Sequence, residues 1–482
     1  MGTFFYFAAG PVQPTTEKRE REANMKLIYD IHDRPSFGKT LVFAFQQLLA
    51  ILAATIAVPT IIGNGMSQSA ALFGAGVGSI VYLLFTKLRS PVFLGSSFAF
   101  IGSMFAAFGG AASAEAGFAG IILGAVFAGL VYVVIAIVVK AAGVKWIDKL
   151  MPAVVIGPTV SIIGLSLAGN AIGDLTTGKV MKDVTVQIIE NGQIVDQVKH
   201  VSAASPYVCL ICGLVTLFTV MLCSVYGRKM AKLIPFILGI LAGYLVAAIF
   251  TVIGRSTGNL ELQVIDFTVF RKMQIFAVPD FTFVKAAKGL SAIDGKYIAT
   301  VAVAYIPVAF VVFAEHIADH KNLSSVINRD LLENPGLHRT LLGDGVGSIA
   351  GALFGGCPNT TYGESVACVA ITGNASVVTI LTTAVMAIVI SFFGPFVTFL
   401  STIPNCVMGG VCITLYGFIA VSGLKMIQKV DLGDNRNLFT VAVILICGIG
   451  GLVVSFGSVT ITSVACALIL GIIANAMLAK KN

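Results

Sequence analysis

Charged residues are scarce in this chain. Asp, Glu, Lys and Arg make up 11% of its 482 residues, whereas hydrophobic residues make up 57%. A soluble domain carries about 25% charged residues. This composition therefore excludes an ordinary water-soluble globule and indicates a protein that lies largely within a membrane. The net charge of +8 accompanies no RNA- or DNA-binding motif, and we expect no nucleic-acid partner.

The chain also lacks the marks of other protein classes. Its loops contain no cysteine, because all nine cysteines lie in apolar stretches, and a disulfide framework is not expected. Cys209 and Cys212 form a CxxC pair, but inside an apolar stretch they should pack as small apolar side chains. No Walker motif is present, which argues against ATP-driven transport by this chain.

The beginning of the chain lacks a cleavable signal. Residues 1–24 are polar, and a second methionine, Met25, opens the segment that leads to the first apolar run. We therefore expect residues 1–24 to be a dispensable tail or the result of an upstream start site. The whole cytoplasmic N-terminal tail should cover residues 1–40.

Long apolar runs dominate the rest of the chain. A helix that crosses a bilayer needs about 20 apolar residues. Fourteen runs approach this length, at about 41–63, 69–87, 93–109, 116–140, 150–170, 206–226, 232–254, 297–320, 340–354, 357–373, 375–397, 403–424, 437–456 and 459–479. Those at 93–109, 340–354 and 357–373 are short or interrupted by Gly and Pro, as in the broken helices of transporter binding sites. We predict an all-α polytopic membrane protein with 14 transmembrane segments.

The distribution of basic residues predicts the orientation of these segments. With the N-terminus inside, 22 of the 31 Lys and Arg residues fall in segments that face the cytoplasm, and the short outer loops hold none. The other nine lie in two long outer loops, 171–205 and 255–296, where the positive-inside rule is weak. Both termini are therefore predicted to be cytoplasmic, in a protein of the cell membrane. In the first loop, alternating runs flank Asn191-Gly192 and predict an external β-hairpin.

Internal repeats indicate that the chain consists of two related halves. Residues 72–85, LFGAGVGSIVYLLF, and 341–354, LLGDGVGSIAGALF, are identical at nine of fourteen positions. A fainter pair, MPAVVIG at 151–157 and IPNCVMG at 403–409, occurs in the same order. In each pair, the second copy lies in the seventh apolar run after the first. Successive runs cross the membrane in alternating directions, so an odd separation gives the two halves opposite orientations. Two inverted repeats of seven segments are typical of secondary transporters.

The sequence PNTTYGE at 358–364 interrupts one apolar run and places a glutamate at membrane depth. Its first residues disfavour a helix, and an apolar helix follows from about Tyr362. A helix that begins inside the membrane presents free N–H groups and the positive end of its dipole, with Glu364 in the first turn. An ionisable residue there is costly and indicates a binding site or pathway. The alternative is that Thr361 and Glu364 only form a capping box.

The matching element in the first half is FLGSSFAF at 93–100, which also has small polar residues before a helix. Ser96 or Ser97 is expected to cap that helix. Two broken helices that begin at mid-membrane from opposite directions would enclose a small cavity where the inverted repeats meet.

A second acidic cluster lies in AEHIAD at 314–319. Glu315 and Asp319 are four residues apart and share one helix face. Neighbouring carboxyl groups that take up and release protons suit proton coupling. Glu315 lies deeper in the run, whereas Asp319 fits either coupling or a hydrated inner end of the helix. We expect His316 and His320 to be hydrated at the inner surface.

A different chemistry is an alternative for the same stretch. The order His316-Ile-Ala-Asp319-His320 is similar to an HxxEH metal motif with Asp in place of Glu, which would make the chain an intramembrane metalloenzyme. A third ligand is missing, because the other histidines lie in loops and no acidic residue is evidently placed to join. We therefore predict no metal, no cofactor and no enzymatic activity.

The AEHI, NPGLHR, PNTTYGE and MGGV stretches together resemble bacterial uracil permeases of the nucleobase–ascorbate transporter family, from about Phe45 to the C-terminus. The resemblance implies short extended segments in spans 3 and 10. It also implies a core domain (41–141, spans 1–4, and 297–397, spans 8–11) that moves in an elevator-like way against a gate domain. The gate domain would comprise 142–296 (spans 5–7 with the long outer loops) and 398–482 (spans 12–14), and homodimers would form through it. The implied activity is uracil import by proton symport, in contact with membrane lipids.

The resemblance also implies roles for individual residues. The substrate-binding residues would be Glu315, Glu364, Phe98, Tyr362, Gly363, Ala54 and Tyr416. Glu315 and Asp319 would carry the coupled proton. Two positions depart from the family pattern, because Asp319 stands where close uracil-type relatives have His and Gln47 replaces another common His. Since xanthine-type members share Asp at the first position, xanthine or another purine is an alternative substrate.

Overall fold

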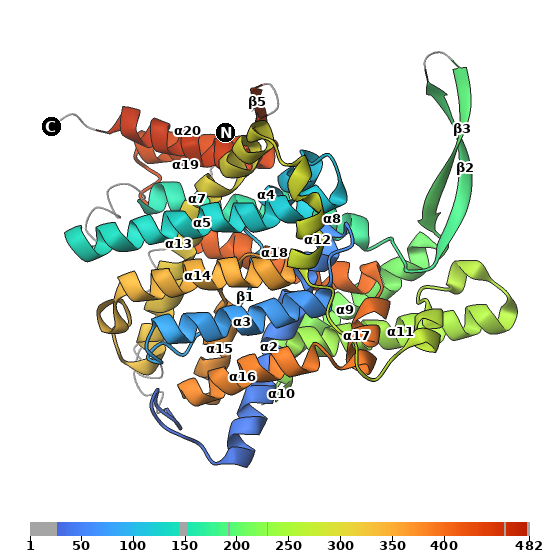
Figure 1. The fold of residues 1–482 in the computed structure, drawn as a ribbon, viewed down its shortest axis with the longest axis horizontal. Coiled ribbons are helices and arrows are strands. Elements are labelled where there is room, and N and C mark those ends of the chain that lie inside the picture. The colour runs from blue at the N-terminus through green and yellow to red at the C-terminus, as the bar shows by residue number, and fades with distance from the viewer. Residues whose placement is uncertain (1–26, 144–151, 191–192, 229, 457–458, 480–482) are drawn as a thin grey trace, which may run out of the picture.

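The computed structural model describes the chain except for residues 1–26, 144–151, 191–192, 229, 457–458 and 480–482. The expected tail at 1–24 therefore lies outside the described residues. Most of the described chain is helical (Figure 1). The helices are α2 (Phe37–Ile62), α3 (Gln68–Phe85), α4 (Ile101–Gly109), α5 (Ala114–Ala142), α7 (Ala153–Ser166), α8 (Ala168–Asp174), α9 (Pro206–Tyr226), α10 (Met230–Leu233), α11 (Pro235–Thr257), α12 (Thr282–Gly289), α13 (Gly295–Ile327), α14 (Leu337–Gly355), α15 (Gly363–Thr372), α16 (Val377–Ile390), α17 (Gly394–Thr402), α18 (Asn405–Ile427), α19 (Asn435–Ile449) and α20 (Ser463–Leu478).

The helices have the length and composition of membrane-crossing segments. Each of the fourteen apolar runs contains a helix. Eight helical stretches in the described part of the chain are long and apolar enough to cross a membrane, with α7 and α8 acting as one stretch, and α15, α16, α19 and α20 are shorter apolar helices. Large hydrophobic side chains such as Phe218, Leu222 and Leu245 are exposed on the outside, where lipid replaces water as the solvent. The chain is therefore a multi-pass membrane protein.

The two copies of the longer repeat pack against each other as α3 and α14. A Cβ added at Gly74 would lie 2.6 Å from the carbonyl oxygen of Gly351, and one added at Gly78 would lie 2.7 Å from that of Gly347. Small residues permit this close approach of two helix backbones in a membrane. Helices α2, α5, α13 and α16 pack around this pair and complete a first group.

A second group of helices comprises α7, α9, α11, α18, α19 and α20. Its centre is the contact of α7 with α18, where a Cβ at Gly164 would lie 2.2 Å from the carbonyl oxygen of Tyr416. Cys209 and Cys212 are buried on α9, which packs on α18, and all nine cysteines are free. The prediction that the CxxC pair packs as small apolar residues is confirmed.

Two three-residue strands, β1 (Leu94–Ser96) and β4 (Asn359–Thr361), pair antiparallel in the interior of the first group. Ser96 lies within β1, and the N–H of Ser97 donates to the carbonyl oxygen of Pro358 at 2.9 Å. Neither serine caps α4, so that expectation was wrong. The reason is that the chain is not yet helical at either serine, and α4 begins only at Ile101 with Phe100 at its N-cap.

The predicted hairpin is confirmed as β2 (Met181–Glu190) and β3 (Gln193–Ser202), which pair along their full length, whereas its location on the outer side of the membrane stays a prediction. The Asn191-Gly192 turn between them lies outside the described residues. The hairpin projects from the body of the helices, at the upper right of Figure 1. A second short hairpin, β5 (Val454–Phe456) and β6 (Val459–Ile461), precedes α20.

Candidate functional site

A cavity of about 350 Å³ lies between the two groups of helices. Its walls come from α13, β4 and α15 on one side and from α7, α10, α11 and α18 on the other. Six of the predicted site residues line it: Phe98, Glu315, Asp319, Tyr362, Gly363 and Glu364. Apolar side chains such as Val160, Ile163 and Leu415 form much of the remaining wall. The fold thus brings three distant stretches of the sequence to one concave surface.

The carboxyl groups reach the cavity from two helices. Glu315 and Asp319 lie one turn apart on α13, and Glu364 lies in the first turn of α15. The hydroxyl of Thr361 donates to Oδ2 of Asp319 at 2.7 Å. The N-cap of α15 is Tyr362, without a side-chain capping bond, so the capping-box alternative was wrong. Thr361 instead ties Asp319 to β4.

The aromatic side chains around the cavity are fixed by their neighbours. The hydroxyl of Tyr362 donates to the carbonyl oxygen of Ser96 at 2.9 Å. The ring of Phe98 packs edge-on against Tyr416, with 5.9 Å between ring centroids. Tyr416 on α18 and Ala54 on α2 are themselves buried and are not among the residues that line the cavity. Tyr416 therefore lies behind Phe98 and not in the cavity wall.

The second helix group contributes side chains that sequence reasoning missed. Lys232 on α10 lines the cavity and is exposed to solvent, and Phe418 and Ser422 on α18 line it as well. In the sequence Lys232 is one of many basic residues that indicate orientation. Nothing local distinguishes it, because its position at the cavity arises only from packing between distant segments.

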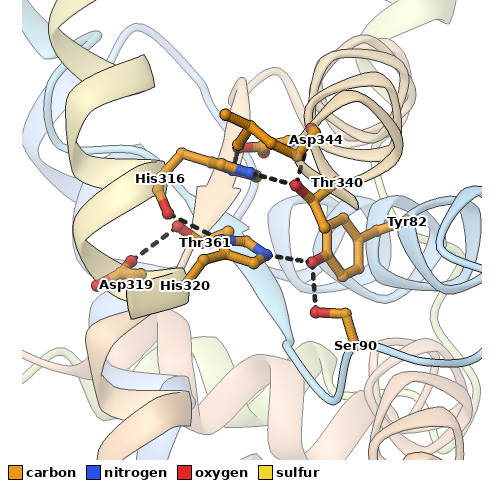
Figure 2. A network of polar contacts seen from close by, with 9 residues as sticks. Tyr82, Ser90, His316, Asp319, His320, Thr340, Asp344 and Thr361 are labelled. Atoms are coloured by element: carbon orange, nitrogen blue, oxygen red, sulfur yellow. Dashed lines mark hydrogen bonds and ion pairs between the residues drawn. The ribbon is translucent and has the colours of Figure 1, made fainter. Parts of the chain in front are cut away.

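Two histidines on another face of α13 belong to a buried polar network (Figure 2). Nδ1 of His316 lies 2.7 Å from Oδ2 of Asp344, and its Nε2 lies 3.0 Å from Oγ1 of Thr340. Nε2 of His320 lies 2.6 Å from the hydroxyl of Tyr82. Both histidines have no exposed surface, so the expectation that they are hydrated was wrong. Since α13 continues to Ile327, they lie inside the helix bundle and not at its surface.

The same network gives every ring nitrogen of these histidines a hydrogen-bond partner. The fourth ring nitrogen, Nδ1 of His320, lies 2.8 Å from the carbonyl oxygen of His316, so every ring nitrogen already has a partner. No group of three or more His, Cys, Asp or Glu in the described part of the chain is arranged to hold a metal ion. Sequence reasoning also missed Asp344 as a partner of His316, because only the folded chain brings α14 to this point.

Gln47, which replaces a histidine of the resembled family, lies behind the cavity. Its amide nitrogen donates to Oγ of Ser365 at 2.6 Å, and the same oxygen accepts the N–H of Phe93 at 3.2 Å. Gln47 is buried in α2, so these bonds join α2, α15 and the residue before β1. The contacts give Gln47 a role in holding the two extended segments in place.

A bundle of apolar helices around a cavity with three carboxyl side chains defines a class of protein, the multi-pass membrane transporters. The fold is similar to the transmembrane domain of the cyanobacterium bicarbonate transporter BicA, with a TM-score of 0.60, 15% sequence identity, and coverage of 91% of this chain and 96% of that chain. At this level of identity the likeness concerns the fold alone.

Sequence comparison defines the family more closely. Residues 38–456 match the model of the Permease family, Xan_ur_permease. The chain is 38% identical over 456 residues to the uracil permease of Bacillus caldolyticus and 36% identical over 458 residues to that of Bacillus subtilis (strain 168); each match covers 94% of this chain and 95% of the relative. The chain belongs to this permease family and is a transporter, not an enzyme.

Proposed function

We propose that this chain imports uracil across the bacterial cell membrane together with protons. Relatives that match nearly the whole chain are named uracil permeases. The observation that carries the proposal is that carboxyl side chains of Glu315, Asp319 and Glu364 face one cavity with otherwise largely apolar walls. A concave apolar surface with a few polar groups that fix orientation is the usual form of a small-molecule site.

The chemistry of uracil fits these groups. Uracil is a planar neutral ring whose edge carries N–H donors and carbonyl acceptors. We assign its N–H groups to the carboxyl groups of Glu315 and Glu364, and a carbonyl to the N–H groups of Gly363 and Glu364 at the start of α15. Phe98 offers an aromatic wall that Tyr416 supports from behind. Tyr362 lies beside Glu364, and Ala54 belongs to the layer behind the cavity.

We assign the transport movement to a displacement of one helix group relative to the other. The proposed core domain (41–141 and 297–397) carries the carboxyl groups, and the proposed gate domain (142–296 and 398–482) carries Lys232 and Phe418. The arrangement that we propose has fourteen spans in two inverted repeats, with extended segments in spans 3 and 10. A cavity lined by both groups supports an elevator-like movement in which the core slides against the gate. Homodimers are proposed to form through the gate.

The exposed Lys232 indicates the side on which the cavity opens. It belongs to a basic segment that the positive-inside rule assigns to the cytoplasm, and it lines the cavity. We therefore interpret the structure as the state open to the cytoplasm, with both termini on that side.

Proton coupling is assigned to Glu315 and Asp319. Both line the cavity from α13, so a proton on either carboxyl group is next to the substrate. The hydrogen bond from Thr361 to Asp319 links the coupling residue to β4, which precedes the substrate-binding start of α15. Substrate and proton binding thus share one short segment of backbone.

The proposal is tested by uptake of radiolabelled uracil in cells that lack their own uracil transport. We expect uptake that a protonophore abolishes, and loss of uptake in Glu315→Gln and Glu364→Gln. Glu333→Gln is the matched control, because Glu333 is exposed in the loop before α14, away from the residues that line the cavity. Near-normal accumulation of uracil by Glu315→Gln would refute the proposed role of that residue.

The same uptake assay determines whether the transported base is a pyrimidine or a purine. Asp319, in place of the His of close uracil-type relatives, makes xanthine the alternative substrate. Unlabelled xanthine at a concentration equal to that of labelled uracil should leave uracil uptake unchanged. Strong competition by xanthine would make the chain a purine or broader nucleobase transporter.

A further inference from the structure

Helix α13 presents different chemistry on two of its faces. Glu315 and Asp319 line the cavity, whereas His316 and His320, each one residue further along, are completely buried against α14 and α3 (Figure 2). Residues four apart share a helix face. The direction in which the two acidic side chains point is therefore determined by what holds the two histidines.

The hydrogen bonds of His316 determine where its hydrogens lie. The hydroxyl of Thr340 donates to the carbonyl oxygen of Leu337 at 3.0 Å, so its only hydrogen is already used. With its hydrogen assigned to Leu337, we assign its oxygen as the acceptor of a hydrogen from Nε2 of His316. The remaining ring nitrogen, Nδ1, faces Oδ2 of Asp344 at 2.7 Å, and a contact of this length requires one hydrogen between the two atoms.

Both positions of that hydrogen leave the pair without net charge. On Asp344 it gives a carboxylic acid beside a neutral imidazole, and on His316 it gives a carboxylate beside an imidazolium. The other oxygen of Asp344, Oδ1, is buried without a hydrogen-bond partner, and so is the hydroxyl of the nearby Tyr132. Burial of a carboxylate oxygen without a hydrogen-bond donor costs much free energy. Burial of the uncharged carbonyl oxygen of a carboxylic acid costs less. The geometry therefore favours the acid form, in which Asp344 donates to His316.

His320 strengthens the same attachment but cannot pass a proton to His316. Its Nδ1 must donate, because its partner is the carbonyl oxygen of His316 at 2.8 Å. Its Nε2 then accepts from the hydroxyl of Tyr82 at 2.6 Å, and the oxygen of Tyr82 lies 2.7 Å from Oγ of Ser90. A carbonyl oxygen ends this chain of hydrogen bonds. The network is therefore an attachment between α13, α14 and α3, and protons that move with substrate must use the cavity face.

We propose that His316 and Asp344 are a positioning pair, uncharged and held by one hydrogen of the Asp344 acid, that sets the rotation of α13 so that Glu315 and Asp319 point into the cavity. This inference rests on the proposed function, because it concerns the residues assigned there to substrate and proton. It adds the requirement that neither member of the pair changes its charge during transport.

The surroundings of the pair contain few other groups that titrate. On α13 itself these are Glu315, Asp319 and His320, and from α5 and α3 they are Tyr132 and Tyr82. Of these, the two acids line the cavity and are the groups assigned to coupling. A variant that disturbs only the pair should therefore change substrate affinity through the direction of the acids and leave the pH dependence of uptake unchanged.

The test compares Asp344→Asn with Asp344→Ala in uptake and in infrared spectra of the purified protein. Asn keeps an N–H donor for Nδ1 of His316 and a carbonyl oxygen in place of Oδ1, so we expect a KM for uracil within about threefold of the original value. Ala removes the donor and should raise KM about tenfold or more, since a lost buried hydrogen bond has this effect. The pH profile should be the same in all three proteins. The infrared spectrum of Asp344→Asn should lack one band of a protonated carboxylic acid.

Each alternative result has a definite meaning. If the Asn substitution removes a carboxylate band instead, the pair is ionic and the proposal is wrong. If Asp344→Ala folds and keeps its KM, or if Asp344→Asn shifts the pH profile, the pair does not act by positioning. Should the Ala variant fail to fold, the Asn variant decides through its KM and its infrared spectrum. Failure of the unchanged protein to take up uracil would refute the proposed function, while the infrared result would still test the pair.

Discussion

Substitution of Gly78 by alanine tests whether close helix contact supports the site. Gly78 lies on α3, where an added Cβ would be 2.4 Å from Nδ2 of Asn359 and 2.7 Å from the carbonyl oxygen of Gly347. The side chain of Asn359 has little room on the other side, because it already lies against Gly351, where an added Cβ would be 2.3 Å from it. Asn359 also donates to the carbonyl oxygen of Gly74 at 3.0 Å. The methyl group must therefore separate the helices or displace Asn359.

The expected loss in the free energy of unfolding follows from separation of the helices and displacement of Asn359. Overpacking of a tight contact costs about 1–3 kcal/mol, and displacement of Asn359 would leave buried polar groups unpaired at a cost of about 1–3 kcal/mol. Alanine is favoured over glycine within a helix by about 1 kcal/mol. We expect a net destabilisation of up to about 2 kcal/mol if one of these changes occurs, and of up to about 5 kcal/mol if both occur. Because Asn359 begins β4, uracil uptake should fall as well.

The assay is thermal unfolding in detergent together with uptake in cells. Gly102→Ala is the matched control, since Gly102 also lies within a helix, α4, but no heavy atom is within 4 Å of its added Cβ. That control should unfold at the same temperature as the original protein or higher. A Gly78→Ala protein as stable and as active as the Gly102→Ala control would refute the argument that the repeat glycines hold β4 in place.

Two further substitutions test the cavity itself. Thr361→Val removes the hydroxyl that donates to Asp319 while it preserves the shape of the side chain. Because Asp319 is proposed to carry the proton, we expect this variant to lose much of the dependence of uptake on the proton gradient, whereas Thr361→Ser should retain it. Equal loss in both variants would contradict a role of the hydroxyl. Lys232→Cys should react with a membrane-impermeant maleimide in inside-out vesicles and not in right-side-out vesicles, with the unsubstituted protein as the background. Labelling only from outside would reverse the proposed orientation.

Sequence patterns predicted those parts of the fold that depend on local composition. Apolar runs long enough to cross a bilayer each contain a helix, because helix formation satisfies the backbone wherever water is absent. The repeat at 72–85 and 341–354 contains the glycines at which α3 and α14 meet. Glu315, Asp319 and Glu364 line one cavity, since acidic side chains that face lipid would be costly.

Features that depend on contacts between distant segments were not predictable in this way. His316 and His320 follow acidic residues near the polar end of an apolar run, and from sequence alone hydration was the simplest interpretation. Their burial requires Asp344 and Tyr82, which belong to other helices. Thr361 has the spacing of a capping box, but β4 turns its hydroxyl toward Asp319. Lys232 lines the cavity only because α10 packs against the first helix group.

The three carboxyl groups around the cavity bear on the proposed proton symport. Glu315, Asp319 and Glu364 line one small and largely apolar space, and like charges repel strongly where the local dielectric constant is low. A neutral base brings no compensating charge when it enters, and Lys232, at the exposed margin of the cavity, is the one basic residue among those that line it. Under the proposed symport, substrate binding is most favourable when a proton enters as well and reduces the repulsion. Replacement of Asp319 by Asn would remove one of the three carboxyl groups, and we expect it to weaken the dependence of uptake on the proton gradient more than it weakens the binding of uracil.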